Sequence, residues 1–167
     1  MATMPFDPAD FEAEAILKLI SSGQMPSFAL DALEAGFNGP HIVRMAILDP
    51  ADGWAIDQVL PRMLDELGCH HFAPKEAALH LAEKRAKRIL ATGEDPLPSL
   101  SYFYRLVFEA GYTEELYPLG SLEDLFDFRS STPEKQRALA YEHIRGFLAD
   151  RQTQQQRGAT PPHSNNP

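Results

Sequence analysis

A Cys69-His70-His71 triplet, with His80 further along, holds the most concentrated set of potential metal ligands in the chain. Three adjacent side chains cannot all point at one ion without unusual backbone geometry, because zinc sites use ligands in separated pairs. We therefore expect no metal here. As a nucleophile, Cys69 would need a base brought to it by the fold, and no catalytic cysteine signature surrounds it. We expect a free, partly buried thiol.

An acidic segment runs from residue 113 to residue 128, without Lys or Arg and with aromatic and leucine side chains between its acids. Aromatic residues can anchor a protein partner, and carboxylates can steer a basic one toward them. We therefore take this segment as a candidate partner-binding surface. Its candidate residues are Glu114, Glu115, Tyr117, Glu123, Asp124, Phe126 and Asp127.

The same segment admits two other interpretations. Glu123 and Asp127 lie one helical turn apart, a spacing that suits a pair of acid/base catalysts. The segment also fits a short amphipathic helix that packs Leu122, Leu125 and Phe126 inward and leaves its carboxylates in water.

A run of basic residues occurs at Lys84, Arg85, Lys87 and Arg88. Such a run could bind phosphate or an acidic partner. More commonly it is the solvated face of a surface helix, where it also complements the dipole of the helix C-terminus. We favour the solvated face.

The chain has 167 residues with 15 Lys and Arg against 24 Asp and Glu, a net charge of −9. That balance argues against nucleic-acid binding, which needs clustered excess cations. Residues 1–74 are the most acidic part, with 11 acids and three bases. The single cysteine fits a reducing compartment, and neither a signal peptide nor an apolar run long enough to span a membrane is evident. We expect a cytoplasmic protein without a cofactor.

Proline and glycine divide the sequence as they do in helical proteins, with Pro at helix starts and Gly just past helix ends. The prolines at predicted starts are Pro8, Pro26, Pro40, Pro74, Pro98 and Pro133. The glycines at predicted ends are Gly23, Gly36, Gly68, Gly93 and Gly111. No convincing alternating pattern indicates a strand, so we predict an all-α fold.

Apolar periodicity places helices over about residues 8–21, 27–35, 40–47, 53–67, 74–91, 98–110 and 133–150. In the helix over 53–67, Trp54 is assigned to the inward apolar stripe, and Pro61 is expected to kink or restart the helix. We predict one domain over residues 1–151, a compact irregular bundle of six to eight helices. Residues 152–167 contain no large apolar side chain and are expected to form a disordered polar tail.

Two stretches resemble a loosely defined group of small bacterial all-helical proteins. The first is Ile20-Ser21-Ser22-Gly23-Gln24-Met25-Pro26 followed by Ala32-Leu33-Glu34-Ala35-Gly36-Phe37-Asn38-Gly39-Pro40-His41-Ile42, and the second is Ala86-Lys87-Arg88-Ile89-Leu90-Ala91-Thr92-Gly93-Glu94-Asp95-Pro96. The chain departs from that group where Thr92 is inserted before Gly93. The group has no assigned chemistry, and the resemblance implies an immunity- or antitoxin-type protein.

Taken together, these patterns favour a non-enzymatic protein-binding module, of immunity or antitoxin type, whose acidic surface covers a basic partner. The alternative is an enzyme or ligand-binding helical protein with a site assembled from scattered residues near His70, His71 and His80.

Overall fold

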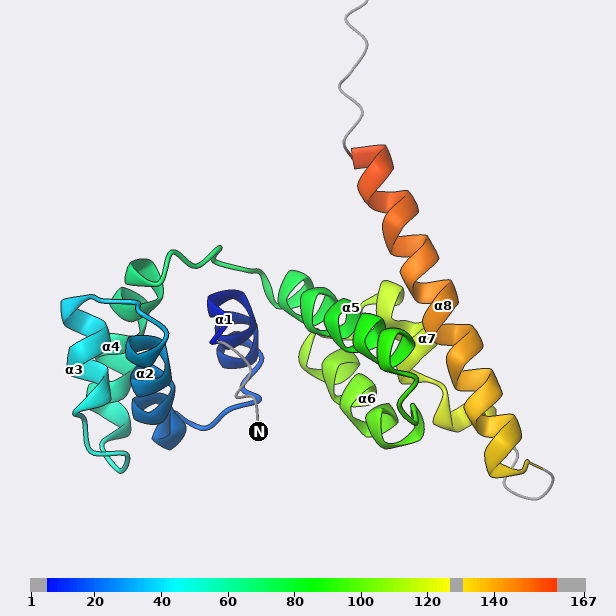
Figure 1. Cartoon of the computed structure of the whole chain (residues 1–167), viewed down its shortest axis with the longest axis horizontal. Helices are drawn as coiled ribbons and strands as arrows, with labels where there is room; N and C mark the ends of the chain where they lie inside the picture. Colours follow the sequence, from blue (N-terminus) through cyan, green and yellow to red (C-terminus); the bar gives the residue numbers. More distant parts are fainter. Residues whose placement is uncertain (1–5, 127–130, 159–167) are drawn as a thin grey trace, which may run out of the picture. The chain divides into compact units, whose positions relative to one another are not determined.

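The computed structural model of the chain describes residues 6–126 and 131–158, and every regular element in these ranges is helical (Figure 1). The described residues form eight α-helices joined by four short 3-10 helices, which confirms the all-α prediction. None of these helices is both long and apolar enough to cross a membrane.

The chain divides into two compact units, Met1–Leu81 and Ala82–Pro167, where the sequence led us to expect one domain over residues 1–151. The boundary falls inside α5 (Pro74–Thr92). We describe each unit by itself.

Unit 1 is built from α1 (Pro8–Ile16), α2 (Met25–Glu34), α3 (Pro40–Ala46), α4 (Gly53–Glu66) and the first turns of α5. A 3-10 helix, Ser22–Gln24, leads into α2. Helices α2, α3 and α4 lie side by side (Figure 1). Their inward faces meet Phe11 of α1 and Leu67, the residue after α4, in one hydrophobic core. Its buried residues are Phe11, Met25, Ala29, Ala32, Ile42, Met45, Ile56, Val59, Met63 and Leu67.

Helix α1 ends at Ile16, several residues before the predicted end near residue 21. Lys18 adopts a left-handed conformation (φ +52°), and the N–H of Leu19 reaches back to the carbonyl of Glu14 at 2.9 Å. This is the helix-closing geometry that glycine usually supplies. Because a lysine occupies the position, the end of α1 could not be predicted from residue type.

Helix α4 corrects the assignment of Trp54 and excludes one of the two effects expected of Pro61. Its buried side chains are Ile56, Val59 and Met63, spaced by three and four residues. Trp54 lies off that stripe and is 76% exposed, so its assignment to the inward face was wrong. The helix also continues through Pro61 instead of restarting there.

The start of α3 is held by Glu66 at the end of α4. The Glu66 carboxylate accepts hydrogen bonds from the backbone N–H groups of His41 (2.9 Å) and Ile42 (3.0 Å), and His41 Nδ1 lies 2.6 Å from Glu66 Oε1. Gly39 makes this possible, because a Cβ at residue 39 would overlap the Glu66 carboxylate. Burial alone would raise the pKa of Glu66, but the hydrogen bonds from His41 and Ile42 outweigh it and lower the pKa.

Unit 2 contains the remainder of α5 with α6 (Leu100–Glu109), α7 (Tyr117–Gly120) and α8 (Pro133–Gly158). Three 3-10 helices connect them: Leu97–Ser99, Glu114–Leu116 and Glu123–Leu125. The predicted helix over 98–110 is thus confirmed, and α7 packs between α6 and α8 (Figure 1). A core cluster of Leu100, Leu122, Phe126 and Ala140 joins these elements.

Helix α8 runs to Gly158, past the start of the disordered tail predicted at residue 152. Gln and Arg are good helix formers, and extending an existing helix costs far less than starting one. The prediction was therefore wrong for residues 152–158, while residues 159–167 lie outside the described ranges.

Polar contacts tie α8 to the end of α5. The Tyr141 hydroxyl donates to the carbonyls of Glu94 (2.7 Å) and Gly93 (3.1 Å), and Arg137 Nε lies 3.0 Å from Asp95 Oδ2. The backbone N–H of Leu97 and the Arg137 guanidinium both bond to Asp95 and lower its pKa. These contacts fasten the residues that follow α5, Gly93 to Asp95, to α8.

Candidate protein-binding surface

Of the acidic residues predicted to bind a partner, the structure places two in the open. Glu114 begins the 3-10 helix after α6 and Asp124 lies in the last 3-10 helix, and both are exposed, whereas Glu115 is half-buried. The side chain of Glu123 is not described, and Asp127 lies outside the described residues. The proposed acid/base pairing of Glu123 with Asp127 therefore stays a prediction.

Of the two predicted aromatic anchors, only Tyr117 is at the surface. Tyr117 is 45% exposed, whereas Phe126 is 8% exposed and packs in the core with Leu122 and Ala140. Phe126 must accordingly be removed from the candidate anchors. Its neighbour Leu125, which the sequence placed inward, is exposed instead.

Sequence reasoning missed a row of exposed aromatic residues on α6. Tyr104, Phe108 and Tyr112 are each more than half exposed, although α6 buries Phe103, Leu106 and Val107 on its other side. The three follow one another at four-residue intervals, which places Tyr104 and Phe108 one turn apart on a single helix face and Tyr112 just beyond the helix end. We call these three residues the aromatic stripe.

The end of the stripe is fixed by local geometry. Gly111 and Tyr112 both adopt positive φ (+72° and +61°), and the N–H of Tyr112 bonds to the carbonyl of Val107 at 2.8 Å, which closes α6. The Tyr112 ring then meets Phe108 edge-on, with ring centroids 5.9 Å apart. A bulky residue in the left-handed conformation is strained, and strain of this kind is found at functional sites.

Tyr117 is held by close packing of α7 on α6. Gly120 allows the approach, because a Cβ at residue 120 would overlap the side chain of Val107. From α8, His143 Nδ1 lies 2.9 Å from the carbonyl of Pro118. These contacts anchor the backbone that carries Tyr117 and its acidic neighbour Glu114.

The charge around the stripe is mostly acidic, although Arg105, between Tyr104 and Phe108 on α6, is an exposed cation. From Leu106 to Phe128 the chain has no Lys or Arg and six acids: Glu109, Glu114, Glu115, Glu123, Asp124 and Asp127. Exposed aromatic side chains with carboxylates nearby and without competing cations in that stretch suit a basic protein surface. Aromatic faces also attract the guanidinium and ammonium groups of Arg and Lys.

The histidines of the alternative site are each held by separate contacts. His80 Nε2 lies 2.8 Å from Asp10 Oδ1, and His71 Nε2 lies 3.3 Å from Asp65 Oδ1. The His70 ring packs against Phe72, with centroids 5.3 Å apart. Phe72 in turn stacks on His80, with centroids 5.4 Å apart. Over the residues the structure describes, no three His, Cys, Asp or Glu side chains are arranged to hold a metal ion.

Cys69 is half-buried and chemically quiet. Its Sγ lies 3.7 Å from the carbonyl of Pro8. Burial, reinforced by the negative charge of Glu12, raises the pKa of the thiol to about 12. A nucleophilic cysteine needs the opposite shift, toward the thiolate.

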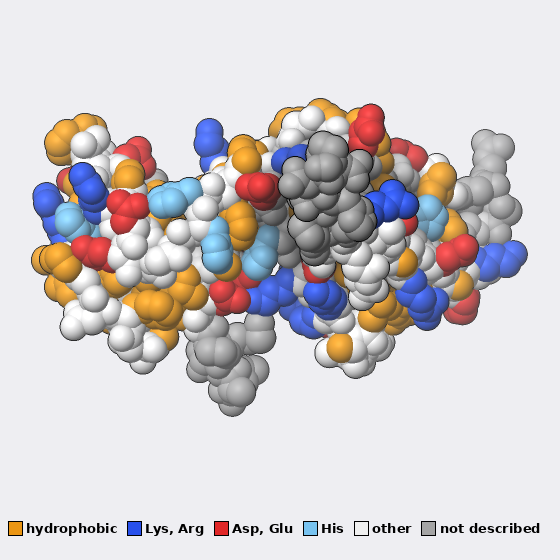
Figure 2. Space-filling model, turned by 90° about the horizontal axis from the view of Figure 1, so that it is seen from above, with side chains coloured by type: hydrophobic (Ala, Val, Ile, Leu, Met, Phe, Trp, Pro, Cys, Tyr) orange, Lys and Arg blue, Asp and Glu red, His pale blue; other side chains and the backbone are white. Residues whose placement is uncertain are grey.

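The basic run on α5 is engaged within unit 2. Lys87 Nζ lies 2.6 Å from Glu83 Oε1, Arg88 Nε lies 3.0 Å from Glu94 Oε1, and the Arg85 guanidinium stacks over Tyr102 at 4.6 Å. Figure 2 shows acidic and basic side chains interspersed on the face that it draws. This arrangement supports the solvated face that we favoured over a phosphate site.

Comparisons with known proteins add nothing to this geometry. A scan against protein-family models, a search of curated proteins and a search of solved structures each found no match to the chain.

Proposed function

We propose that this chain is a non-enzymatic protein-binding module that covers a basic surface of a partner protein with the aromatic stripe, Tyr117 and the acids beside them. The observation that carries the proposal is the exposure of four aromatic side chains within fourteen consecutive residues of the sequence, Tyr104 to Tyr117. Soluble proteins keep single apolar residues at the surface, but repeated large aromatic ones mark interaction sites.

The mechanism follows from the residue types. Tyr104, Phe108 and Tyr112 supply rigid apolar contact area, and the carboxylates of Glu114 and Asp124 pair with Lys or Arg on the partner. Steric occlusion of that basic surface is the activity we propose, as the resemblance to immunity- and antitoxin-type proteins implies. We propose the cytosol as its compartment, because a single cysteine suits a reducing environment.

The test is capture of the partner from the native cell, followed by binding measurements with the purified pair. Charge reversal at Glu114 and Asp124 and the separate variant Phe108→Ala should each weaken binding about tenfold or more. The matched control reverses Glu142 and Asp150, two exposed acids of α8, and makes the same change in net charge.

Binding by the control pair is expected to stay within about twofold of the unaltered chain, because these two acids are not among the residues of the proposed surface. Equal affinity of all variants for the purified partner would contradict the proposed surface. Turnover of a small molecule by the purified chain would contradict the non-enzymatic proposal.

A further inference from the structure

The two most exposed large hydrophobic side chains of the described residues lie at one end of unit 1. Ile47 is 80% exposed and Trp54 is 76% exposed. They flank the turn between α3 and α4, Ile47 as the residue that ends α3 and Trp54 in the first turn of α4. Single exposed aliphatic residues are ordinary, but a tryptophan and an isoleucine on the two sides of one turn, each more than three-quarters exposed, mark a candidate interaction site.

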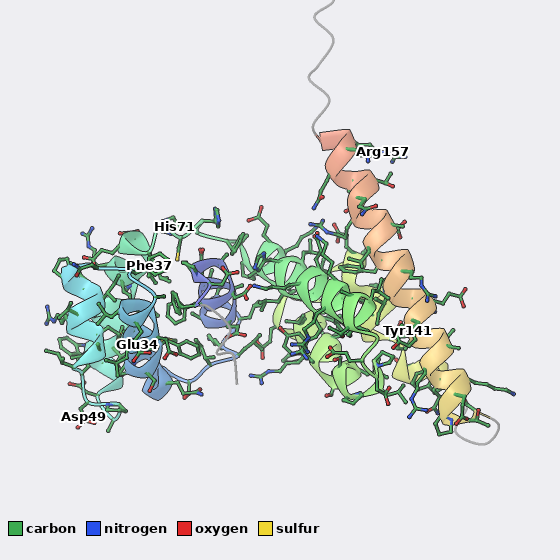
Figure 3. The ribbon with its side chains drawn as sticks, viewed as in Figure 1. Glu34, Phe37, Asp49, His71, Tyr141 and Arg157 are labelled. Atoms are coloured by element: carbon green, nitrogen blue, oxygen red, sulfur yellow. The ribbon has the colours of Figure 1, made fainter. Side chains whose placement is uncertain are left out.

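The turn that carries them is rigid. Asp49 Oδ1 accepts from the N–H of Ala51 at 2.9 Å, and the N–H of Asp52 bonds to the Asp49 carbonyl at 2.9 Å. Asp52 Oδ1 then caps α4 by accepting from the N–H of Ala55 at 3.0 Å. Figure 3 labels Asp49 at this turn.

A second element braces the turn from the side. The 3-10 helix Ser22–Gln24 lies against it, since a Cβ on Gly23 would stand 3.1 Å from the Pro50 carbonyl oxygen. Side chains held on such a scaffold lose little freedom when a partner binds, which favours affinity. We call Ile47, Asp49, Asp52 and Trp54 the α3–α4 tip.

The net charge of the tip and of unit 1 indicates which kind of binding partner it attracts. Residues 1–81 carry 12 acids and only four bases, and the tip contributes two of those acids beside its apolar side chains. A second copy of unit 1 would bring the same sign of charge, and an anionic membrane surface would repel it. The acidic residues of unit 1 therefore favour a positively charged partner.

We propose that the α3–α4 tip docks into a basic, amphipathic segment of another protein, with Trp54 and Ile47 filling its apolar face and Asp49 and Asp52 pairing with its Lys or Arg. Tryptophan is among the residues that dominate interface energetics, and charges at its rim set the partner's sign. The tip belongs to the other unit from the aromatic stripe, and its role stands independently of the function proposed above.

The chain supplies its own reporter, because Trp54 is its only tryptophan. We would titrate the full chain at physiological salt with an amphipathic helical peptide made of Leu and Lys and follow Trp54 fluorescence. The expected result is a saturable shift of emission to shorter wavelength as the indole leaves water. A Leu and Glu peptide of the same length, and a peptide of Lys alone, should leave the emission unchanged.

Two sets of variants sharpen the test. The double variant Asp49→Asn with Asp52→Asn removes both charges, keeps a side-chain oxygen for each turn hydrogen bond, and should weaken peptide binding about tenfold. Ile47→Ser should weaken it to a similar extent without unfolding the chain, because the side chain is exposed. The control, Asp31→Asn with Glu34→Gln on the exposed side of α2, makes the same change in net charge and should bind within about twofold of the unaltered chain.

Several results would overturn the proposal. Equal weakening by the control pair would show that only the overall charge matters. A blue shift that follows the chain's own concentration would assign the tip to self-association. A shift with phosphatidylcholine or phosphatidylglycerol vesicles, but none with the Leu and Lys peptide, would assign it to a lipid surface. Since the aromatic stripe contains no tryptophan, failure here leaves the first proposal untouched.

Discussion

Glu12 shows how one residue can organise a loop. Its side chain is fully buried, and its two carboxylate oxygens accept hydrogen bonds from the backbone N–H groups of His70 (2.7 Å) and Phe72 (2.8 Å). The residues between α4 and α5 are thereby fastened to α1. Burying a carboxyl group costs folding free energy unless its oxygens accept hydrogen bonds. Glu12 can therefore stay buried only while the N–H groups of His70 and Phe72 bond to it.

Replacing Glu12 should destabilise unit 1 in a graded way. Glu12→Ala leaves two backbone donors without their acceptor, and we expect a loss of about 2–4 kcal/mol in the free energy of unfolding. Glu12→Gln keeps one acceptor oxygen and should lie between Ala and the unaltered chain. Urea unfolding followed by circular dichroism measures the order. Glu34→Ala on the exposed surface of α2 is the control, and a Glu12→Ala midpoint equal to that control would contradict the role.

Cys69 should resist alkylation in the folded chain. With the thiol pKa raised to about 12, only a small fraction is thiolate at pH 8, whereas an unfolded cysteine titrates near pH 8.5. Labelling with iodoacetamide at pH 8 should therefore be at least about 100-fold slower in buffer than in denaturing urea. The folded chain binds the thiol proton more tightly than the unfolded chain does. This tighter binding contributes fully to the free energy of unfolding below about pH 8.5, and the contribution is lost as pH rises from there toward 12. Similar labelling rates in buffer and urea would refute the burial of the thiol.

At the scale of elements, α3 depends on a close contact at Gly39, the residue just before its first turn. Gly39→Ala forces a methyl group into the Glu66 carboxylate that caps the helix, and we expect a loss of about 1–3 kcal/mol. Gly146 offers the matched comparison, because it lies inside α8 with open space where a Cβ would go. Gly146→Ala should stabilise the chain by about 0.5–1 kcal/mol. Thermal unfolding of both variants checks the opposite signs; two shifts in the same direction would be inconsistent with this packing.

The Glu66 cap should make the stability of the α3 N-terminus sensitive to acid. The pKa of Glu66 is lower in the folded chain than in the unfolded chain, where it is near 4.3. The ionised carboxylate therefore adds to the free energy of unfolding above about pH 4.3, and this contribution is lost as pH falls through the pKa of the folded chain. The difference in stability between the unaltered chain and Glu66→Gln should therefore shrink as pH falls below about 4. Urea midpoints of the two chains at pH 6 and at successively lower pH measure it. A constant difference would show that the carboxylate charge plays no part.

Helix boundaries were predictable from sequence where glycine or proline marks them. Gly36, Gly68, Gly93 and Gly111 all adopt positive φ at helix ends, as expected, whereas Gly23 lies within a 3-10 helix. Lys18 closes α1 in the same conformation, and nothing in its residue type reveals it. Local spacing identifies a helix end only when the residue there differs chemically from an ordinary surface residue.

The candidate surface was predictable in its acids but not in its aromatic face. Between residues 114 and 125 the chain changes from one short helix to another, so its helical phase is interrupted. Periodicity could not tell that Phe126 turns inward while Leu125 turns outward. The assignment of Trp54 to the core was wrong for a related reason. Residue type alone assigns large apolar side chains to the core, but tertiary packing decides which of them stay exposed.

At the scale of the whole molecule, charge is divided unequally between the two units. Residues 1–81 hold 12 acids and four bases, whereas residues 82–167 hold 12 acids and 11 bases. The acidic surplus of unit 1 therefore acts over a longer range than any single contact, and it chiefly affects the rate of encounter with a cationic partner.

Binding at the α3–α4 tip should be sensitive to salt. We expect the affinity for the Leu and Lys peptide to fall about tenfold or more between 20 mM and 500 mM NaCl, because the Debye length drops from roughly 20 Å to about 4 Å. Stopped-flow measurement of Trp54 emission should assign most of this loss to the association rate. Salt-independent affinity would mean that apolar contact alone holds the peptide, and that the acids of the tip are incidental.

The last turns of α8 have a practical consequence. Gln152 to Arg157 are all exposed, and no core side chain of the described residues follows Phe147. An affinity handle or fluorescent protein joined beyond this stretch leaves the core clusters of both units unaltered, so the chain can be immobilised through it for the capture experiment.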